Sequence, residues 1–142
     1  MENKITLDTG IKTYHINESG ILRFNPSDPN VYKRFRDLSV KIEEMRAEYE
    51  KRMERSKDSV EAIDLLADCD HQMKAALTFV FGEWNDFDSI FEGTNIMAVA
   101  GNGEMVITNF LDAMRPIIEE GVKVYAKMEA QKAAQSVKRA EK

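Results

Sequence analysis

Short runs of hydrophobic and β-branched residues mark the first 24 positions and predict β-strands. Lys4–Thr9, Ile11–Ile16 and Ile21–Phe24 have this composition. Gly10 and the sequence NESG at Asn17–Gly20 separate them, and Asn and Gly supply the positive-φ conformations that tight turns require. We therefore expect a small β-hairpin or a three-stranded meander. Two strands alone are marginal in water, so this element should pack against helices or another molecule.

A corner with two prolines follows and predicts the start of a long helix. Asn25 and Asp28 each precede a proline, which keeps both residues out of the α region. Asp28 is suited to cap the helix, and Pro29 suits its first position because the missing N–H costs nothing there. One face then carries apolar residues at helical spacing, namely Val31, Phe35, Leu38, Ile42, Met45, Tyr49 and Met53. The other face is charged, so we expect an amphipathic helix with one solvated side.

The sequence SKDS at 56–59 predicts a break and a cap before a second helix. The apolar stripe of this helix comprises Ala62, Leu65, Leu66, Cys69, Met73, Ala76, Leu77 and Val80. Gly82 should end it near Phe81. Asn85 or Asp86 should then cap a short turn, which contains Phe87, Ile90 and Phe91.

The last third predicts one more helix, with an ambiguous segment before it. Ile96–Ala100 is apolar and fits either a strand or a helix. The final helix should begin near Glu104, and its apolar residues are Met105, Val106, Phe110, Leu111, Met114, Ile117, Ile118, Val122, Tyr125 and Met128. Pro116 lies inside this pattern, so we expect a kink or a break near residues 113–115. Beyond Met128 large apolar residues are almost absent, which predicts a frayed helix or a disordered tail.

Together these elements predict a mainly α fold with a small N-terminal β-element (α+β). We expect a β-hairpin or meander over residues 1–24 and a bundle of three to five helices over residues 25–128, both in one globular unit. Residues 129–142 should form a flexible basic tail. A chain of 142 residues with 43% hydrophobic residues can build one ordinary core but hardly two.

Charge is unevenly distributed along the chain. Residues 1–60 carry 12 basic and 11 acidic side chains, residues 61–120 carry 2 and 12, and residues 121–142 carry 6 and 2. The acidic middle repels phosphates, so we expect no nucleic-acid partner, because non-specific binding depends on clustered Lys and Arg. The basic tail is suited to an acidic partner, which includes the acidic middle of the chain itself.

The sequence lacks a long apolar run, a secretory signal and a second cysteine, and this limits its expected location and redox chemistry. The longest apolar runs fall far short of the roughly 20 residues that a bilayer span needs, so we expect no membrane segment. The first residues have no apolar run after a basic start, which predicts no secretory signal and a cytoplasmic protein. Cys69 is the only cysteine, which excludes an intramolecular disulfide and a multi-cysteine zinc motif.

Three groups of residues could form a metal site, a nucleophile pair or a phosphate loop, but each has a simpler structural interpretation. Asp64, Asp68 and His71 share one predicted helix face and could bind a metal, but no second Glu-x-x-His helix accompanies them. Cys69 and His71 point in different directions, which argues against a nucleophile pair. The sequence AGNGEM at 100–105 lacks the Lys-Ser/Thr of a phosphate loop. We therefore predict a non-enzyme with no catalytic, cofactor-binding or metal-ligating residues.

The eight methionines suit a core or a surface that adapts to a partner. We predict that any partner contact lies in an apolar groove, formed by Phe35, Ile42, Met45, Phe110, Met114 and Ile117. The alternative is that these six residues are ordinary core. Self-association is left open.

Taken in order, these motifs resemble the tail assembly chaperones of long-tailed phages and prophages of Gram-positive bacteria. The pieces most alike are LRFNPSDPN (Leu22–Asn30), Phe81-Gly82 with the acidic aromatic turn to Phe91, and FLDAMRPIIEE (Phe110–Glu120). The likeness covers about residues 11–125. Members of the family often have Gly-Thr where this chain has Trp84-Asn85 after FGE.

The resemblance implies a non-enzymatic role without cofactors. Such chaperones bind the tape measure protein, keep its long hydrophobic chain soluble and recruit the major tail (tube) protein around it in the host cytoplasm. Two other classes remain open. The chain could instead be a structural tail or connector protein retained in the virion, or a small helical regulatory binding protein.

Overall fold

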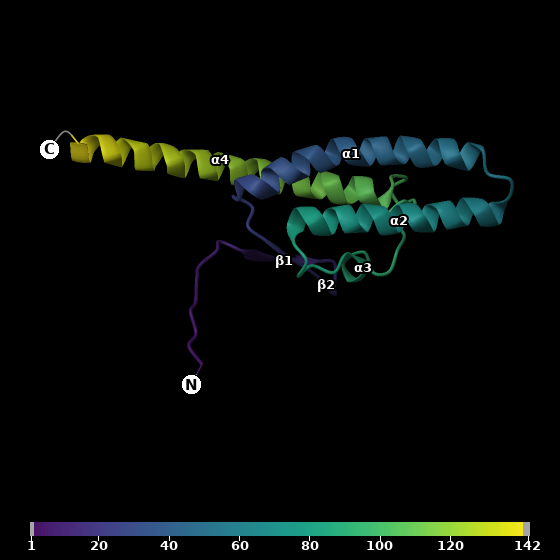
Figure 1. The fold of residues 1–142 in the computed structure, drawn as a ribbon, viewed down its shortest axis with the longest axis horizontal. Helices are drawn as coiled ribbons and strands as arrows, with labels where there is room; N and C mark the ends of the chain where they lie inside the picture. Colours follow the sequence, from purple (N-terminus) through teal and green to yellow (C-terminus); the bar gives the residue numbers. More distant parts are fainter. Residues whose placement is uncertain (1, 141–142) are drawn as a thin grey trace.

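A two-stranded hairpin followed by four helices makes up the computed structural model, which describes residues 2–140 (Figure 1). The elements are β1 (Lys12–Ile16), β2 (Gly20–Phe24), α1 (Pro29–Glu54), α2 (Ser59–Phe81), α3 (Phe87–Ile90) and α4 (Val106–Ala140). The predicted mainly helical α+β class is confirmed. No helix within residues 2–140 combines the length and the apolar character that crossing a membrane would require.

α1 and α2 form a long helical hairpin whose ends follow local sequence signals. Asp28 caps α1 by accepting a hydrogen bond from the Asn30 N–H at 2.9 Å, and Pro29 occupies the first helical position. Asp58 caps α2 in the same way through the Glu61 N–H at 2.8 Å. Gly82, with φ of 111°, ends α2 as predicted.

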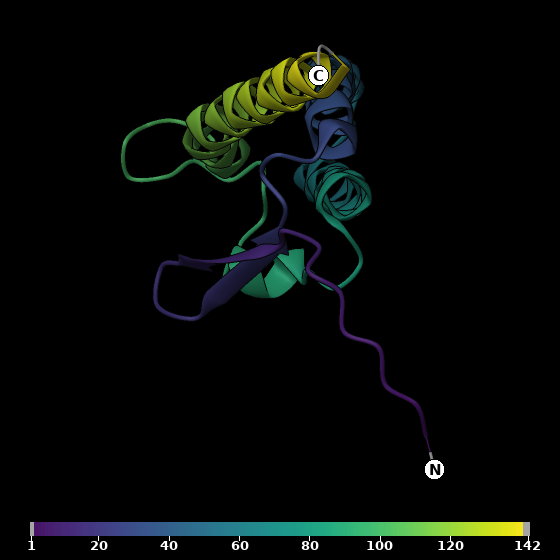
Figure 2. The same cartoon turned by 90° about the vertical axis from the view of Figure 1, so that its left-hand side faces the viewer.

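α4 runs beside α1 in the opposite direction, and its last part extends past the start of α1 (Figure 1). The hairpin and α3 lie together on one side of the helices (Figure 2). Phe81, at the end of α2, joins these parts because its ring centroid lies 5.1 Å from that of Phe24 and 5.9 Å from that of Phe110. The core is therefore densest where the hairpin meets the helices.

Asn85 fixes the hairpin to the end of α2. Its side chain is only 4% exposed. The Oδ1 atom accepts a hydrogen bond from the Arg23 N–H at 2.7 Å, while Nδ2 donates to the carbonyls of Arg23 and Phe81, both at 3.0 Å. A buried amide that satisfies backbone groups on two elements holds β2 in one register against α2.

Lys74 and Asp70 hold the segment after α3 against α2. The Ile96 N–H donates to Asp70 Oδ1 at 2.6 Å, and the Lys74 ammonium lies 3.0 Å from Asp70 Oδ2 and 2.9 Å from Asp88 Oδ1. Burial alone would lower the pKa of Lys74, but hydrogen bonds and charges from Asp88 and Asp70 outweigh it and raise the pKa. The charged lysine therefore stays paired inside this turn.

Several sequence predictions were wrong in detail. Lys4–Thr9 forms no strand, so the β-element is a hairpin and not a meander. Ile96–Ala100 is neither strand nor helix, because Asp70 binds the backbone at Ile96 and only an isolated bridge joins Val99 to Met105. The hairpin therefore depends on packing rather than on a third strand of its own.

Pro116 does not break α4, which is continuous from Val106 to Ala140. Pro116 is exposed, so the Asp112 carbonyl that loses its usual hydrogen-bond partner can be hydrated. Residues 129–140 continue the helix with exposed side chains, and their flexibility stays a prediction. Residues 141–142 of the predicted tail lie outside the described residues.

Candidate partner-binding cleft

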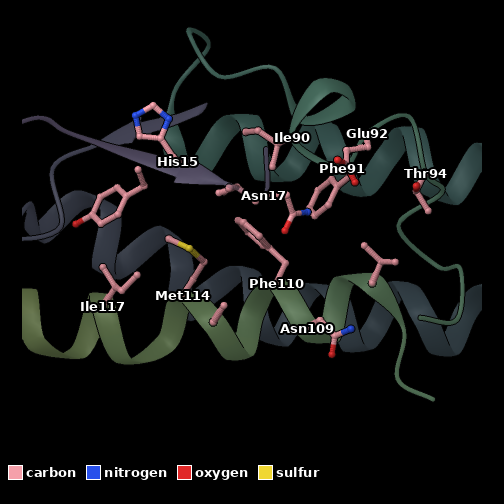
Figure 3. Close-up of a pocket in the computed structure, with 14 residues that line it drawn as sticks. His15, Asn17, Ile90, Phe91, Glu92, Thr94, Asn109, Phe110, Met114 and Ile117 are labelled. Atoms are coloured by element: carbon pink, nitrogen blue, oxygen red, sulfur yellow. The ribbon is translucent and has the colours of Figure 1, made fainter. Parts of the chain in front are cut away.

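An open cleft lies between β1, the α3 turn and the first half of α4 (Figure 3). Its volume is about 470 Å³, within the roughly 300–1,000 Å³ range common for ligand pockets. Most of its lining is apolar. The side chains that define it are Tyr14, Ile16, Phe91, Phe110, Met114 and Ile117.

α4 supplies one wall through residues at helical spacing. Phe110, Met114 and Ile117 all point from α4 toward the hairpin (Figure 3). Phe110 is 7% exposed and Met114 is 4% exposed, whereas Ile117 is half-buried. The Phe110 ring is held in place by Phe91, whose centroid lies 5.3 Å away in an edge-on arrangement. Phe110 and Met114 therefore form a buried base of this wall, and Ile117 forms its more accessible rim.

β1 supplies the facing wall. The Tyr14 ring stacks on Phe24 at a centroid distance of 5.1 Å, and burial raises the pKa of its hydroxyl. Ile16 lies on the same face of the strand, two residues further on. His15 points to the other side, away from α4 (Figure 3). His15 also borders the cleft, but the face of β1 that is turned toward α4 is apolar.

The backbone edge of β1 beside the cleft has no partner strand. β1 pairs antiparallel with β2, and Thr13 lies opposite Arg23. Because the N–H and C=O of Arg23 both bind Asn85, the Thr13–Arg23 pair is not hydrogen-bonded. Such pairs alternate with hydrogen-bonded ones, so the same holds for the His15–Ile21 pair, two pairs further along. The N–H and C=O groups of Thr13 and His15 therefore face outward, and they have no backbone or side-chain partner within residues 2–140.

The six residues predicted as one groove all belong to the hydrophobic core or pack against it, as the alternative interpretation expected, and only three of them line the cleft. Phe110, Met114 and Ile117 line the cleft. Phe35 and Ile42 are 5% and 3% exposed in the core, and the half-buried Met45 lines a separate hollow between α1 and α2. Helical periodicity identifies the buried face of α1 but not which element covers it.

The strand and turn residues of the cleft were not predicted. Tyr14 and Ile16 carry a signal in the sequence, since they alternate on one face of a predicted strand. Ile90 and Phe91 carry a weaker signal, because a short turn has no periodicity that would show which way its side chains point. The pairing of this strand with α4 depends on tertiary packing, which no local pattern encodes.

Other polar groups serve the structure. The Tyr49 hydroxyl donates a hydrogen bond to Asp68 and joins α1 to α2. Cys69 is fully buried, and burial, followed by the charges of Asp68 and Asp70, raises the pKa of its thiol to about 11. A thiol with this pKa is a weak nucleophile at neutral pH. Over residues 2–140, no set of three His, Cys, Asp or Glu side chains is arranged to hold a metal ion.

A second exposed feature lies at the end of α2. Phe79 and Trp84 are 70% and 60% exposed. The Arg34 guanidinium lies 5.3 Å from the Phe79 ring centroid, and that of Arg23 lies 4.9 Å from the Trp84 ring. Aromatic and Arg residues of this kind are common in protein interfaces. Phe79 borders the hollow between α1 and α2, and Trp84 borders a recess beside Arg23.

No protein-family model matches the chain, and it has no significant match among curated proteins or solved structures.

Proposed function

We propose that this chain is a tail assembly chaperone of a long-tailed phage or prophage. In this role it binds the tape measure protein in the host cytoplasm, keeps it soluble and recruits tail tube subunits. The observation that carries the proposal is the open apolar cleft between β1 and α4. The ordered resemblance of residues 11–125 to such chaperones supports the same role.

The cleft is suited to transient capture of apolar side chains. Ile117 offers an accessible aliphatic side chain, and the flexible Met114 and the rigid ring of Phe110 form the buried base behind it. Burial of one large aliphatic side chain contributes roughly 2 kcal/mol, so two or three contribute about 4–6 kcal/mol before ordering costs. Binding of this strength can be released when tube subunits cover the tape measure protein.

Co-expression tests this role. The tape measure protein encoded next to this chain is produced alone, with the wild-type chain and with variants, and its soluble fraction is measured. We expect the wild-type chain to raise that fraction. Ile117→Glu, which places a charge on the half-buried rim of the cleft, should abolish the gain.

Val137→Glu is the matched control, because it makes the same kind of change on α4 at a site that is 57% exposed and remote from the cleft. It should act like the wild-type chain, and circular dichroism should show that both variants are folded. A tape measure protein that is equally insoluble with and without the wild-type chain contradicts the proposal.

The protein content of mature particles distinguishes a chaperone from a structural tail or connector protein. A chaperone leaves during assembly, so purified virions should be depleted of this chain relative to tail tube protein. Retention in every virion at a fixed ratio would favour the structural role instead.

A further inference from the structure

Residues 2–11, here called the arm, extend from the body as an unpaired strand-like segment. The arm alternates apolar and polar residues, and Ile5 and Leu7 are 84% and 76% exposed. The sequence predicts a strand over Lys4–Thr9, but the structure gives this segment no partner strand within residues 2–140. Two large apolar side chains at alternate positions of one segment would lie on the same face of a strand.

The base of the arm is attached on the side of the hairpin remote from the cleft. The Thr9 carbonyl accepts a hydrogen bond from Asn25 Nδ2 at 3.0 Å. Gly10, with φ of 73°, turns the chain there, where a Cβ would lie 2.7 Å from Asn25 Nδ2. Thr9 and Ile11 border the recess beside Arg23, on the β2 side. Figure 2 shows the arm leaving away from α4 and from the hairpin turn.

The free edge of β1 lies on the opposite side, over the cleft. Its outward N–H and C=O groups at Thr13 and His15 are unpaired. An added strand would bond to them and would place one row of side chains toward Met114 and Ile117. While Thr9 stays bound to Asn25, the arm of the same chain points away from this edge.

We propose that two copies of this chain exchange arms, with Lys4–Asp8 of each copy adding as a third strand to the free edge of β1 in the other, while Thr9 stays bound to Asn25 of its own chain. Ile5 and Leu7 of the incoming arm face the cleft. Every copy carries both the strand and the edge, so the contact closes as a symmetric dimer. The arm would occupy the same cleft that the proposed function assigns to the tape measure protein, so the two would compete for it. The dimer itself involves only copies of this chain and is tested without the tape measure protein.

Two variants remove the two halves of the contact separately. Leu7→Asp places a charge where the arm enters the cleft, at a site too exposed to affect the body. His15→Pro removes one outward N–H of the edge and leaves the bonds between β1 and β2. Sedimentation equilibrium of the full chain over a wide concentration range should show a wild-type dimer, with a dissociation constant at least about tenfold higher in each variant.

Two matched controls show whether loss of the dimer comes from the edge and the arm or from any change of side chain or charge. His15→Thr changes the side chain but keeps the N–H, and Val137→Asp adds a charge at another exposed apolar site, which lies on α4. Both should dimerise like the wild-type chain. Thermal unfolding should show that His15→Pro is folded, and Leu7→Asp tests the proposal even if it is not.

Mixing the two variants provides the sharpest test. The Leu7→Asp chain keeps an intact edge and the His15→Pro chain keeps an intact arm, so the mixture can form one of the two exchanged contacts. At a concentration at which each variant alone is monomeric, we expect the mixture to form a weak mixed dimer. A wild-type chain that is monomeric at every concentration overturns the proposal, as does a Leu7→Asp chain that dimerises as well as the wild type.

Discussion

At the scale of single residues, a few buried polar side chains position the cleft. Asn85 occupies the outward groups of Arg23, and this choice of register turns those of Thr13 outward on the other edge of the hairpin. The edge is free because the sheet has only two strands, and the register that Asn85 binds determines which groups of β1 face outward along it. Asp70 and Lys74 fix the α3 side of the cleft, because they bind the segment that follows Phe91.

Tyr49 links the two long helices and should make stability fall in alkaline solution. It is 6% exposed, and burial, followed by the hydrogen bond to Asp68, raises its pKa from 10.0 to about 12. A folded pKa above the unfolded one gives a contribution that is complete below pH 10 and lost as the pH rises toward 12.

Urea unfolding should show this contribution as the difference in the free energy of unfolding between the wild-type chain and Tyr49→Phe. At pH 7 we expect the variant to be about 1 kcal/mol less stable, because Asp68 loses its donor. The difference should shrink as the pH rises above 10, in the range where Tyr49 titrates. Tyr125→Phe is the control, since that ring is 42% exposed on α4. A constant difference across this range would contradict the prediction.

At the scale of elements, local signals were enough for α1, α2 and α3. Asp28, Asp58 and Asp86 all cap helices where the sequence predicted a cap or a break. Predictions failed where a distant contact decides the conformation. Ile96 is drawn into a turn by Asp70, 26 positions earlier, and that contact has no signature in the apolar run itself.

The candidate site was only half predictable for the same reason. Phe110, Met114 and Ile117 stand on one face of a periodic helix, so their shared orientation follows from the sequence. Phe35 belongs to an equally periodic face that is fully covered by other elements. Periodicity shows which side chains turn inward, but whether the space between elements is filled or open depends on how they pack.

Gly121 sets how closely α4 approaches the corner before α1. A Cβ at this position would lie 1.8 Å from the Pro26 carbonyl oxygen, which is backbone and cannot rotate away. Alanine normally favours a helix over glycine by about 1 kcal/mol. We expect Gly121→Ala to do the opposite and to lower the free energy of unfolding by roughly 2–3 kcal/mol, because α4 must move away from the corner.

Chemical denaturation measures this effect, and Gly101→Ala is the control. Gly101 has open space around its Cβ direction and no positive φ, so its replacement should change stability by less than about 0.5 kcal/mol. If Gly121→Ala were as stable as the wild type, the close contact between α4 and Pro26 would not form in solution.

At the scale of the whole molecule, the shape is a compact body with a projecting helix. The last buried residue of α4 is Gly121, and residues 123–140 are exposed. The helix beyond Gly121 continues past the body for about 28 Å (Figure 1). Residues 123–140 carry five basic side chains and one acidic side chain, so the net charge of the projecting part is opposite to that of the acidic middle of the chain.

Amide hydrogen exchange should divide α4 at the edge of the body. Most helical stability in proteins comes from tertiary packing, so residues 123–140, which are exposed, should exchange fast while residues 107–118 are protected. Deletion of residues 129–142 should accordingly change the free energy of unfolding by less than about 0.5 kcal/mol, because no buried side chain is lost within residues 129–140. Measurement at low concentration avoids contacts between copies. Strong protection through residue 140 would mean that this helix is stable on its own, and the predicted flexible tail would then be wrong.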